Sequence, residues 1–144
     1  MLTPVLKLVE IPGVTADPMS VWNIRALEVN GTSISIAVMA QLAESEPKNF
    51  KKIRTSLRVA ALSEHCKNER YVVSSDNFPG VYEARAHALK ARMMFFYSKR
   101  DRAIVCTNGC WKSSDNQEKA FSDSFDFKKL YEESHANKSP KKPR

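Results

Sequence analysis

Basic side chains are concentrated between Val81 and Lys112, in a stretch whose residues are typical of β-strands. This stretch contains seven Lys and Arg residues against two acidic ones, and it accounts for most of the net charge of +7 of the 144-residue chain. Its cations are Arg85, Lys90, Arg92, Lys99, Arg100, Arg102 and Lys112. Clustered positive charge favours polyanionic partners, of which nucleic acid is the first.

Such a cluster can cleave RNA without a metal ion. Attack by the 2′-hydroxyl of the RNA itself needs a base, positive charge around the pentacoordinate phosphorus, and an acid for the leaving oxygen. Arginine supplies planar bidentate charge, and histidine, lysine or tyrosine can move the protons. Arg85 and His87 share one face of a strand, so we expect this face and Arg92 to surround a phosphate. A face with Arg85 and Tyr97 is the alternative.

Other residue types that carry chemistry fit functional sites less well. Trp111 can stack on a base or cover the edge of the core. The chain has three cysteines and no CxxC pair, which indicates reduced thiols. We expect neither a zinc site at Cys106 and Cys110 nor a thiol nucleophile at Cys110, and we interpret His65 as structural. Without a glycine-rich phosphate loop or metal-ligand spacing, no cofactor or metal is expected.

The hydrophobic pattern of the sequence changes from strand to helix periodicity and back, and this pattern predicts the elements that position the basic residues. Asn30-Gly31 is a strong turn signal after a stretch of strand-forming residues. Apolar residues then recur at helical spacing over residues 36–43 and, after Pro47, over residues 50–61. Further strands are predicted at residues 81–85, 92–97 and 103–107. A last helix is predicted to start near Asp115.

The length suits one domain, since domains typically have about 100–200 residues. We predict a single domain over residues 1–136, with residues 1–20 as a candidate N-terminal extension, and a disordered basic tail over residues 137–144. Residues 3–10 can pair with the sheet or belong to the extension, and we favour the extension. No apolar stretch approaches the ~20 residues that span a bilayer, and no secretory signal is evident. A cytoplasmic protein without a membrane partner is therefore expected.

The ordered set of segments from about residue 20 to 135 resembles the RelE/HigB superfamily of toxins, and most closely its phage-derived HigB-like branch. That branch has an aromatic-Glu-Leu-Arg strand, a strand that opens with Arg, and a third strand that ends in His-Gly-Phe-x-Lys-Lys. The matching segments here are Tyr82-Glu83-Ala84-Arg85, Ala91-Arg92-Met93-Met94-Phe95-Phe96-Tyr97 and Trp111-Lys112-Ser113. Ala84 departs from the usual leucine, and residues 108–113 lack the His and the second Lys.

The resemblance implies an α+β fold in which two N-terminal helices pack on a small, mainly antiparallel twisted sheet, with a C-terminal helix. It also implies a toxin of a type II toxin–antitoxin system, a ribosome-dependent mRNA endonuclease that needs no metal. Its partners would be the ribosome, mRNA and a cognate antitoxin, commonly a helix-turn-helix protein. By position, Arg85, Arg92 and Lys112 match the branch's cations.

We therefore predict a catalytic group and a set of RNA contacts. Arg85, Arg92 and Lys112 would hold the scissile phosphate, and His87 and Tyr97 would transfer protons. The RNA contacts would be Lys90, Lys99, Arg100, Arg102 and Trp111. The alternatives are a non-catalytic relative that binds RNA or an acidic protein through the same basic face, and a ParE-like gyrase inhibitor.

Overall fold

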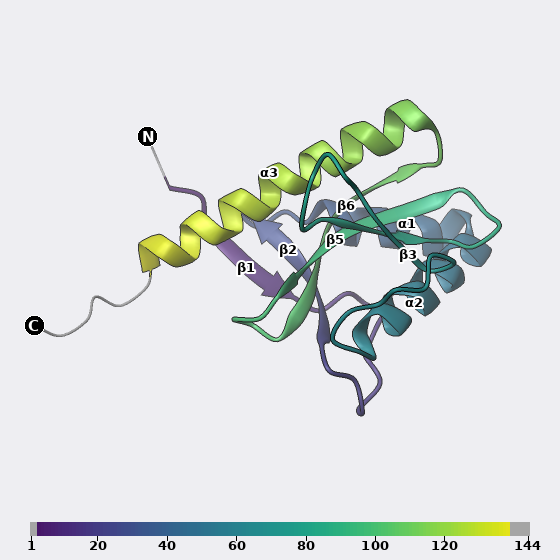
Figure 1. Cartoon of the computed structure of the whole chain (residues 1–144), viewed down its shortest axis with the longest axis horizontal. Helices are drawn as coiled ribbons and strands as arrows, with labels where there is room; N and C mark the ends of the chain where they lie inside the picture. The colour runs from purple at the N-terminus through teal and green to yellow at the C-terminus, as the bar shows by residue number, and fades with distance from the viewer. Residues whose placement is uncertain (1–2, 139–144) are drawn as a thin grey trace, which may run out of the picture.

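The computed structural model describes residues 3–138, with side chains up to His135. The fold is α+β, with three helices and a mixed sheet of six strands in the order β1-β2-β6-β5-β4-β3 (Figure 1). The strands are β1 (Leu6–Val9), β2 (Asn23–Val29), β3 (Val72–Ser74), β4 (Tyr82–Arg85), β5 (Ala91–Ser98) and β6 (Ala103–Trp111). The helices are α1 (Ile34–Ser45), α2 (Pro47–Ala61) and α3 (Ser114–Lys138).

The centre of the sheet joins segments that are far apart in the sequence. β2 and β6 are parallel neighbours, and all the other neighbouring strands are antiparallel. α1 and α2 pack against one face of the sheet, and α3 crosses the other face over β5 and β6 (Figure 1). The sheet therefore lies between two helical layers, and side chains on both of its faces are buried.

Local signals explain where α1 and α2 begin. The Ser33 hydroxyl accepts a hydrogen bond from the backbone N–H of Ile36 at 3.2 Å, which satisfies one of the free donors at the start of α1. α2 begins with Pro47, a residue that needs no hydrogen-bond acceptor in the first turn. Ile53 and Leu57 on its apolar face are fully buried against the sheet. The turn and helix signals in the sequence were thus sufficient to predict this helical pair.

α3 covers the opposite face with residues spaced along its length. Phe121 contacts Met94 and Val81 near the start of the helix, whereas Tyr131 contacts Phe96 near its end. Burial of such side chains contributes roughly 1.5–3 kcal/mol each. The result is a long helix that is held to the sheet at both ends.

The α+β class that was predicted from the sequence is confirmed, but the expected arrangement is not the one observed. The two helices are not N-terminal, because β1 and β2 precede them, and the sheet is mixed, with six strands. The separate extension favoured for residues 3–10 was wrong, since Leu6–Val9 pairs with β2 as the edge strand. The predicted disordered tail falls on residues 137–144, of which only 137 and 138, at the end of α3, are among the described residues.

Membrane association was also assessed from the helices. Within residues 3–138, no helix is both long enough and apolar enough to cross a bilayer.

Candidate nucleic-acid interface

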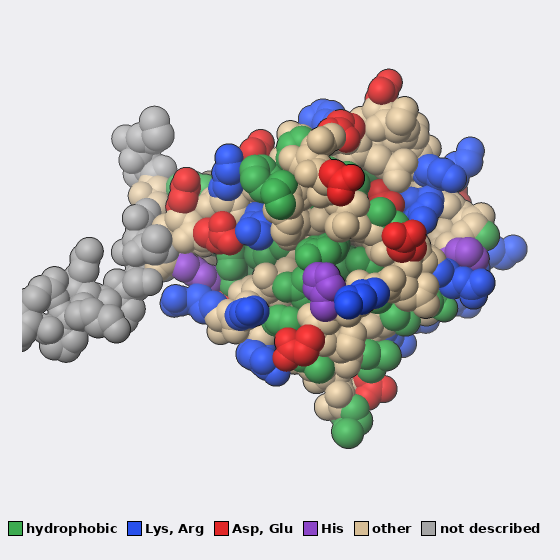
Figure 2. Space-filling model, in the orientation of Figure 1, with side chains coloured by type: hydrophobic (Ala, Val, Ile, Leu, Met, Phe, Trp, Pro, Cys, Tyr) green, Lys and Arg blue, Asp and Glu red, His purple; other side chains and the backbone are tan. Residues whose placement is uncertain are grey.

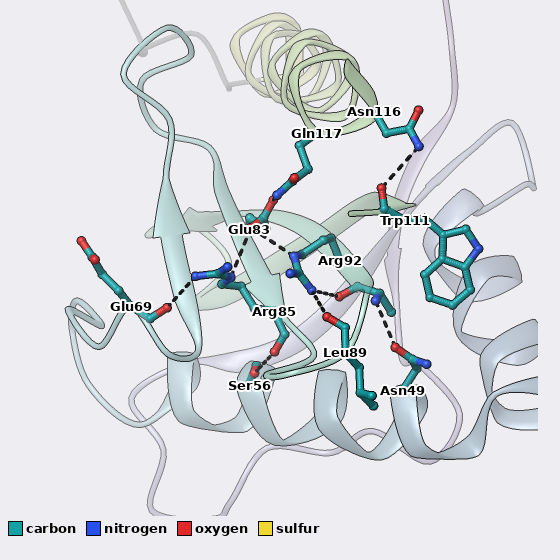
Figure 3. Close-up of polar contacts among 11 residues, drawn as sticks. Asn49, Ser56, Glu69, Glu83, Arg85, Leu89, Arg92, Trp111, Asn116 and Gln117 are labelled. Carbon is teal, nitrogen blue, oxygen red and sulfur yellow. Dashed lines mark hydrogen bonds and ion pairs between the residues drawn. The ribbon is translucent and has the colours of Figure 1, made fainter. Parts of the chain in front are cut away.

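Arg85 and Arg92 lie directly opposite each other on β4 and β5, on the face of the sheet that α3 covers. Two residues before Arg85, and therefore on the same face, Glu83 extends toward both of them (Figure 3). Its Oε2 lies 3.7 Å from Nε of Arg85 and 3.5 Å from Nε of Arg92. The structure thus brings together two of the predicted catalytic arginines, with a carboxylate between them.

The inner part of this cluster is closed to solvent. Glu83 and Arg92 expose only 2% and 3% of their areas. Nη1 of Arg92 donates to the carbonyl oxygens of Leu89 and Ala91, and Gln117 from α3 donates to Oε1 of Glu83 at 2.7 Å (Figure 3). Burial lowers the pKa of Arg92, while Glu83 opposes that shift by stabilising the charged form. The Arg92 side chain is therefore held in place, and a ligand in solution cannot reach it in this structure.

Arg85 is the arginine of the pair that solvent reaches. About a third of its side chain is exposed, and its Nη1 donates to the carbonyl oxygen of Glu69 at 3.2 Å. Its own carbonyl accepts from the Ser56 hydroxyl of α2. The strand end that carries Arg85 is consequently fixed by both neighbouring segments (Figure 3).

A cationic surface surrounds His87 in the turn between β4 and β5. The His87 side chain is exposed. Desolvation is the larger cause that lowers its pKa below the ordinary 6.5, and the charges of Arg70, Lys52 and Arg85 lower this pKa further because they disfavour another positive charge. Figure 2 shows Lys and Arg side chains gathered around this end of the sheet, at the right of the view. We call Lys52, Arg70, Arg85 and His87 the turn patch.

The end of β6 extends this positive surface. The backbone N–H of Lys112 donates to the carbonyl of Lys90 at 2.7 Å, so the two lysines leave the sheet at the same end, and both are exposed. Trp111 is 45% exposed, and its carbonyl accepts from Asn116 at the start of α3. An indole with this exposure beside lysines can stack on an unpaired base. The predicted RNA contacts Lys90 and Trp111 and the predicted catalytic Lys112 thus lie together at this end of the sheet.

Tyr97 is not part of this cluster, and its pairing with Arg85 was wrong. It lies on the opposite face of the sheet, where its ring packs against Trp22, Tyr82 and Phe95. Burial raises the pKa of Tyr97 to about 12, which opposes a role in proton transfer near neutral pH.

The remaining predicted contacts, Lys99, Arg100 and Arg102, belong to the far end of the sheet. They follow β5, which is eight residues long, so they lie roughly 25 Å from Arg92 at about 3.3 Å per residue. The guanidinium of Arg102 is 5.7 Å from the ring centroid of Trp22. The cations that form one group in the sequence therefore make two separate surfaces.

Glu83 and Gln117 are the members of the site that sequence reasoning missed. Strand alternation already placed Glu83 on the face of Arg85, and this was the signal that it would meet the arginines. Gln117 gave no such signal, because its contact depends on where α3 crosses the sheet.

Thiol and metal chemistry find no support among the described residues. Burial raises the pKa of Cys106 to about 12 and that of Cys110 to about 11, so neither forms a thiolate near neutral pH. Within residues 3–138, no group of three His, Cys, Asp or Glu side chains is arranged to hold a metal ion.

Comparison with known proteins leaves the function to be argued from this geometry. No family model, no curated protein and no solved structure matches the chain.

Proposed function

We propose that this protein is an endoribonuclease of the toxin type, which cleaves translated mRNA at the turn patch and its extension along the end of β6. The observation that carries the proposal is the registered pair Arg85 and Arg92 beside an exposed histidine whose pKa is lowered by desolvation and by surrounding cations. Action on ribosome-bound mRNA would take place in the cytoplasm, and a cognate antitoxin would neutralise it by covering this surface.

The accessible residues divide the reaction between them. His87 is neutral near pH 7 because its pKa lies below 6.5, so its free nitrogen can accept the proton of a 2′-hydroxyl. The 2′-oxygen then attacks phosphorus, and the bond to the 5′-oxygen breaks. Arg85 stabilises the added negative charge, and the ammonium group of Lys112 donates a proton to the leaving oxygen. The products are a 2′,3′-cyclic phosphate and a 5′-hydroxyl end.

The buried residues act on the reaction through Arg85. Glu83 pairs with Arg85 and Arg92 together, and Arg92 is anchored to two backbone carbonyls. This chain of contacts limits the rotamers of Arg85 and aims its guanidinium along the strand end. Arg92 is thus a positioning residue in this proposal, and Tyr97 has no part in it.

The order of elements also supports the proposal. From β2 onward, the Asn30-Gly31 turn, two helices and the antiparallel strands β4, β5 and β6 follow in an order similar to that of the RelE/HigB superfamily, while β1 and β3 are additional strands. The resemblance further suggests an antitoxin, often a helix-turn-helix protein, as the partner.

A second function is favoured by one specific observation. Arg92 and Glu83 are almost wholly buried with opposite charges 3.5 Å apart, which suits a structural ion pair, although Nε of Arg92 has no hydrogen-bond partner within the described residues. In a non-catalytic relative, the turn patch would bind RNA or an acidic protein through charge alone, with binding that weakens steeply as salt increases.

Expression in bacteria, followed by mapping of 5′-hydroxyl mRNA ends, separates the two functions. The wild type should slow growth and create new ends within translated messages, and Arg85→Ala and His87→Ala should each reduce cleavage at least tenfold. Arg92→Ala is a poor probe because it would leave Glu83 buried without its closest cation. Lys48→Ala, which removes an exposed cation of α2, is the matched control and should cleave normally. A wild type that creates no ends in translated mRNA would refute the nuclease.

A further inference from the structure

A second concave surface lies at the other end of β5 from the turn patch, with a cavity volume of about 560 Å³. Its wall and rim include Trp22, His65, Tyr82, Tyr97, Lys99 and Arg100. Figure 2 shows hydrophobic side chains in a hollow of this face below α3, with Lys, Arg and His side chains around them. Sites for small ligands commonly have volumes of about 300–1,000 Å³, so the size suits one nucleotide.

Aromatic rings form the wall of this cavity. Tyr97 is at their centre, with its ring centroid 5.1 Å from those of Trp22 and Tyr82 and 5.9 Å from that of His65. His65 is exposed and Tyr82 and Tyr97 are partly exposed, whereas Trp22 is buried behind them. The exposed rings are therefore held by their neighbours and face the cavity. Because these side chains are already fixed, they lose little conformational freedom when a ligand binds.

The sheet leaves this space open because β4 is shorter than β5. The first residue of β4, Tyr82, pairs with Phe95, so Phe96, Tyr97 and Ser98 have no strand beside them on that side within the described part of the chain. Their other side pairs with β6. A ligand can thus reach both aromatic side chains and the strand edge.

The rim of the cavity carries two cations, Lys99 and Arg100, and two carboxylates, Glu64 and Glu132. Lys99 and Arg100 are consecutive and exposed in the turn after β5. Of the nearby carboxylates, Asp101 accepts a hydrogen bond from Tyr131 and lies 3.7 Å from His135, and Glu132 pairs with Lys128 at 2.8 Å. His135 is a cation only when it is protonated. Within the described residues, neither Lys99 nor Arg100 forms an ion pair with a carboxylate. The two turn cations are therefore available to a phosphate.

The turn that carries these cations is fixed to the body of the protein. The Ser98 hydroxyl accepts from the backbone N–H of Asp101 at 3.1 Å, and it lies 2.5 Å from the Tyr131 hydroxyl of α3. This bonding holds the direction of the turn, so Lys99 and Arg100 start from a defined backbone at the mouth of the cavity.

We propose that this cavity binds one unpaired nucleotide of an RNA strand, with its base against the rings of Tyr97 and His65 and its phosphate on Lys99 and Arg100. The choice of RNA as the source of the nucleotide rests on the proposed function, whereas the nucleotide chemistry follows from the rings and cations alone. Base–aromatic stacking tolerates any sequence and is worth about 1–3 kcal/mol per base. The cavity is a second contact for a strand that also crosses the turn patch, roughly 25 Å away along β5.

The test is binding of a fluorescent 2′-O-methyl oligonucleotide to the whole chain, measured by anisotropy. The 2′-O-methyl groups prevent cleavage, so the result does not depend on nuclease activity. His65→Ala should weaken binding about 5- to 100-fold if the base stacks there. Lys99→Ala/Arg100→Ala should also weaken it, and should lower the slope of log K against log salt by about 0.7 if one phosphate contact is lost. Lys129→Ala, which removes an exposed cation of α3, should bind as the wild type does.

Competition by small ligands identifies what the cavity takes. Adenosine monophosphate should displace the oligonucleotide from an Arg85→Ala variant at concentrations where inorganic phosphate does not. If a free nucleotide binds more tightly than the oligonucleotide, the ligand is a metabolite and not a nucleotide of RNA, which would contradict the proposal. If phosphate competes as well as adenosine monophosphate, or if the α3 control loses as much affinity as the cavity variants, binding depends on overall charge alone. Either result would refute the nucleotide site in the cavity.

Other outcomes separate this inference from the proposed function. The proposal would also be refuted if both cavity variants bound RNA as the wild type does. Strong binding of an extended peptide at the free edge of β5 would then identify a peptide as the ligand instead. Loss of binding in the cavity variants without any mRNA cleavage in cells would keep the cavity and remove the nuclease.

Discussion

The carboxylate of Glu83 lies 3.5 Å from Nε of Arg92, and both side chains are almost completely buried between β4, β5 and Gln117 of α3. Removal of one charge from such a pair leaves the other without compensation in a region of low polarity, whereas removal of both leaves only a change of shape. This asymmetry makes the pair the most sensitive point of the proposed site.

Glu83→Gln should lower the free energy of unfolding by about 3–5 kcal/mol, because Arg92 then stays buried without its counter-charge. The double variant Glu83→Met/Arg92→Met should be clearly more stable than Glu83→Gln, since neither charge remains. Urea unfolding followed by circular dichroism measures both. A Glu83→Gln protein within about 0.5 kcal/mol of the wild type would show that the pair does not constrain the fold.

His87 should titrate below pH 6.5, since desolvation and the charges of Arg70, Lys52 and Arg85 all favour its neutral form. Because a nearby anion favours the protonated form, binding of RNA to the turn patch should raise the pKa of His87. NMR titration of the imidazole ring, with and without a 2′-O-methyl oligonucleotide, measures both shifts.

Arg70→Ala is the matched variant for the same measurement, and it should raise the pKa of His87 in the free protein toward 6.5. Lys48→Ala should leave this pKa unchanged, because Lys48 is not among the charges that act on the imidazole. If neither the Arg70→Ala substitution nor bound RNA changes the pKa of His87, the turn patch is not an anion-binding surface.

Gly109→Ala should destabilise the protein by about 1–3 kcal/mol. A Cβ atom at Gly109 would lie 2.8 Å from the carbonyl oxygen of Arg92 and 3.1 Å from a methyl group of Val38, so the backbone of β5 would have to shift. Thermal unfolding measures the loss. Gly31→Asn is the comparison, since nothing lies within 4 Å of a Cβ there and its cost comes from the positive φ of 84° alone, which asparagine adopts more readily than most other residues. Equal effects of the two substitutions would rule out the close contact as the cause.

Tyr131→Phe should cost about 1–3 kcal/mol, because the ring stays in place while Asp101 and Ser98 both lose the tyrosine hydroxyl. Amide hydrogen exchange should increase in the last turns of α3 and in the turn after β5, and should change little around β3 and β4. Tyr71→Phe is the control, since the Tyr71 hydroxyl has no hydrogen-bond partner among the described residues. Exchange that stays slow at the end of α3 would mean that this hydroxyl does not hold the helix.

Some parts of the fold follow from short-range rules and were predicted from the sequence. The Asn30-Gly31 turn, Pro47 at the start of a helix, and the strand-forming runs of β4 and β5 each depend on neighbours within a few residues. The start of α3 near Asp115 was predicted on the same basis, and α3 begins at Ser114. The pairing of residues 3–10 with the sheet was the less favoured alternative, because the four residues of β1 carry little periodicity and their pairing with β2 is a long-range contact.

The basic character of residues 81–112 was determined by the sequence alone, as was the sharing of one face by Glu83 and Arg85. Only the tertiary structure decided which cations act together. β5 carries Arg92 at one end and leads to Lys99 at the other, so an extended strand separates groups that are seven residues apart. α3 then covers Arg92 and leaves Arg85 exposed, because its path depends on the packing of Phe121 and Tyr131 against the sheet. Charge composition is a local property, whereas access to that charge depends on which element lies over it.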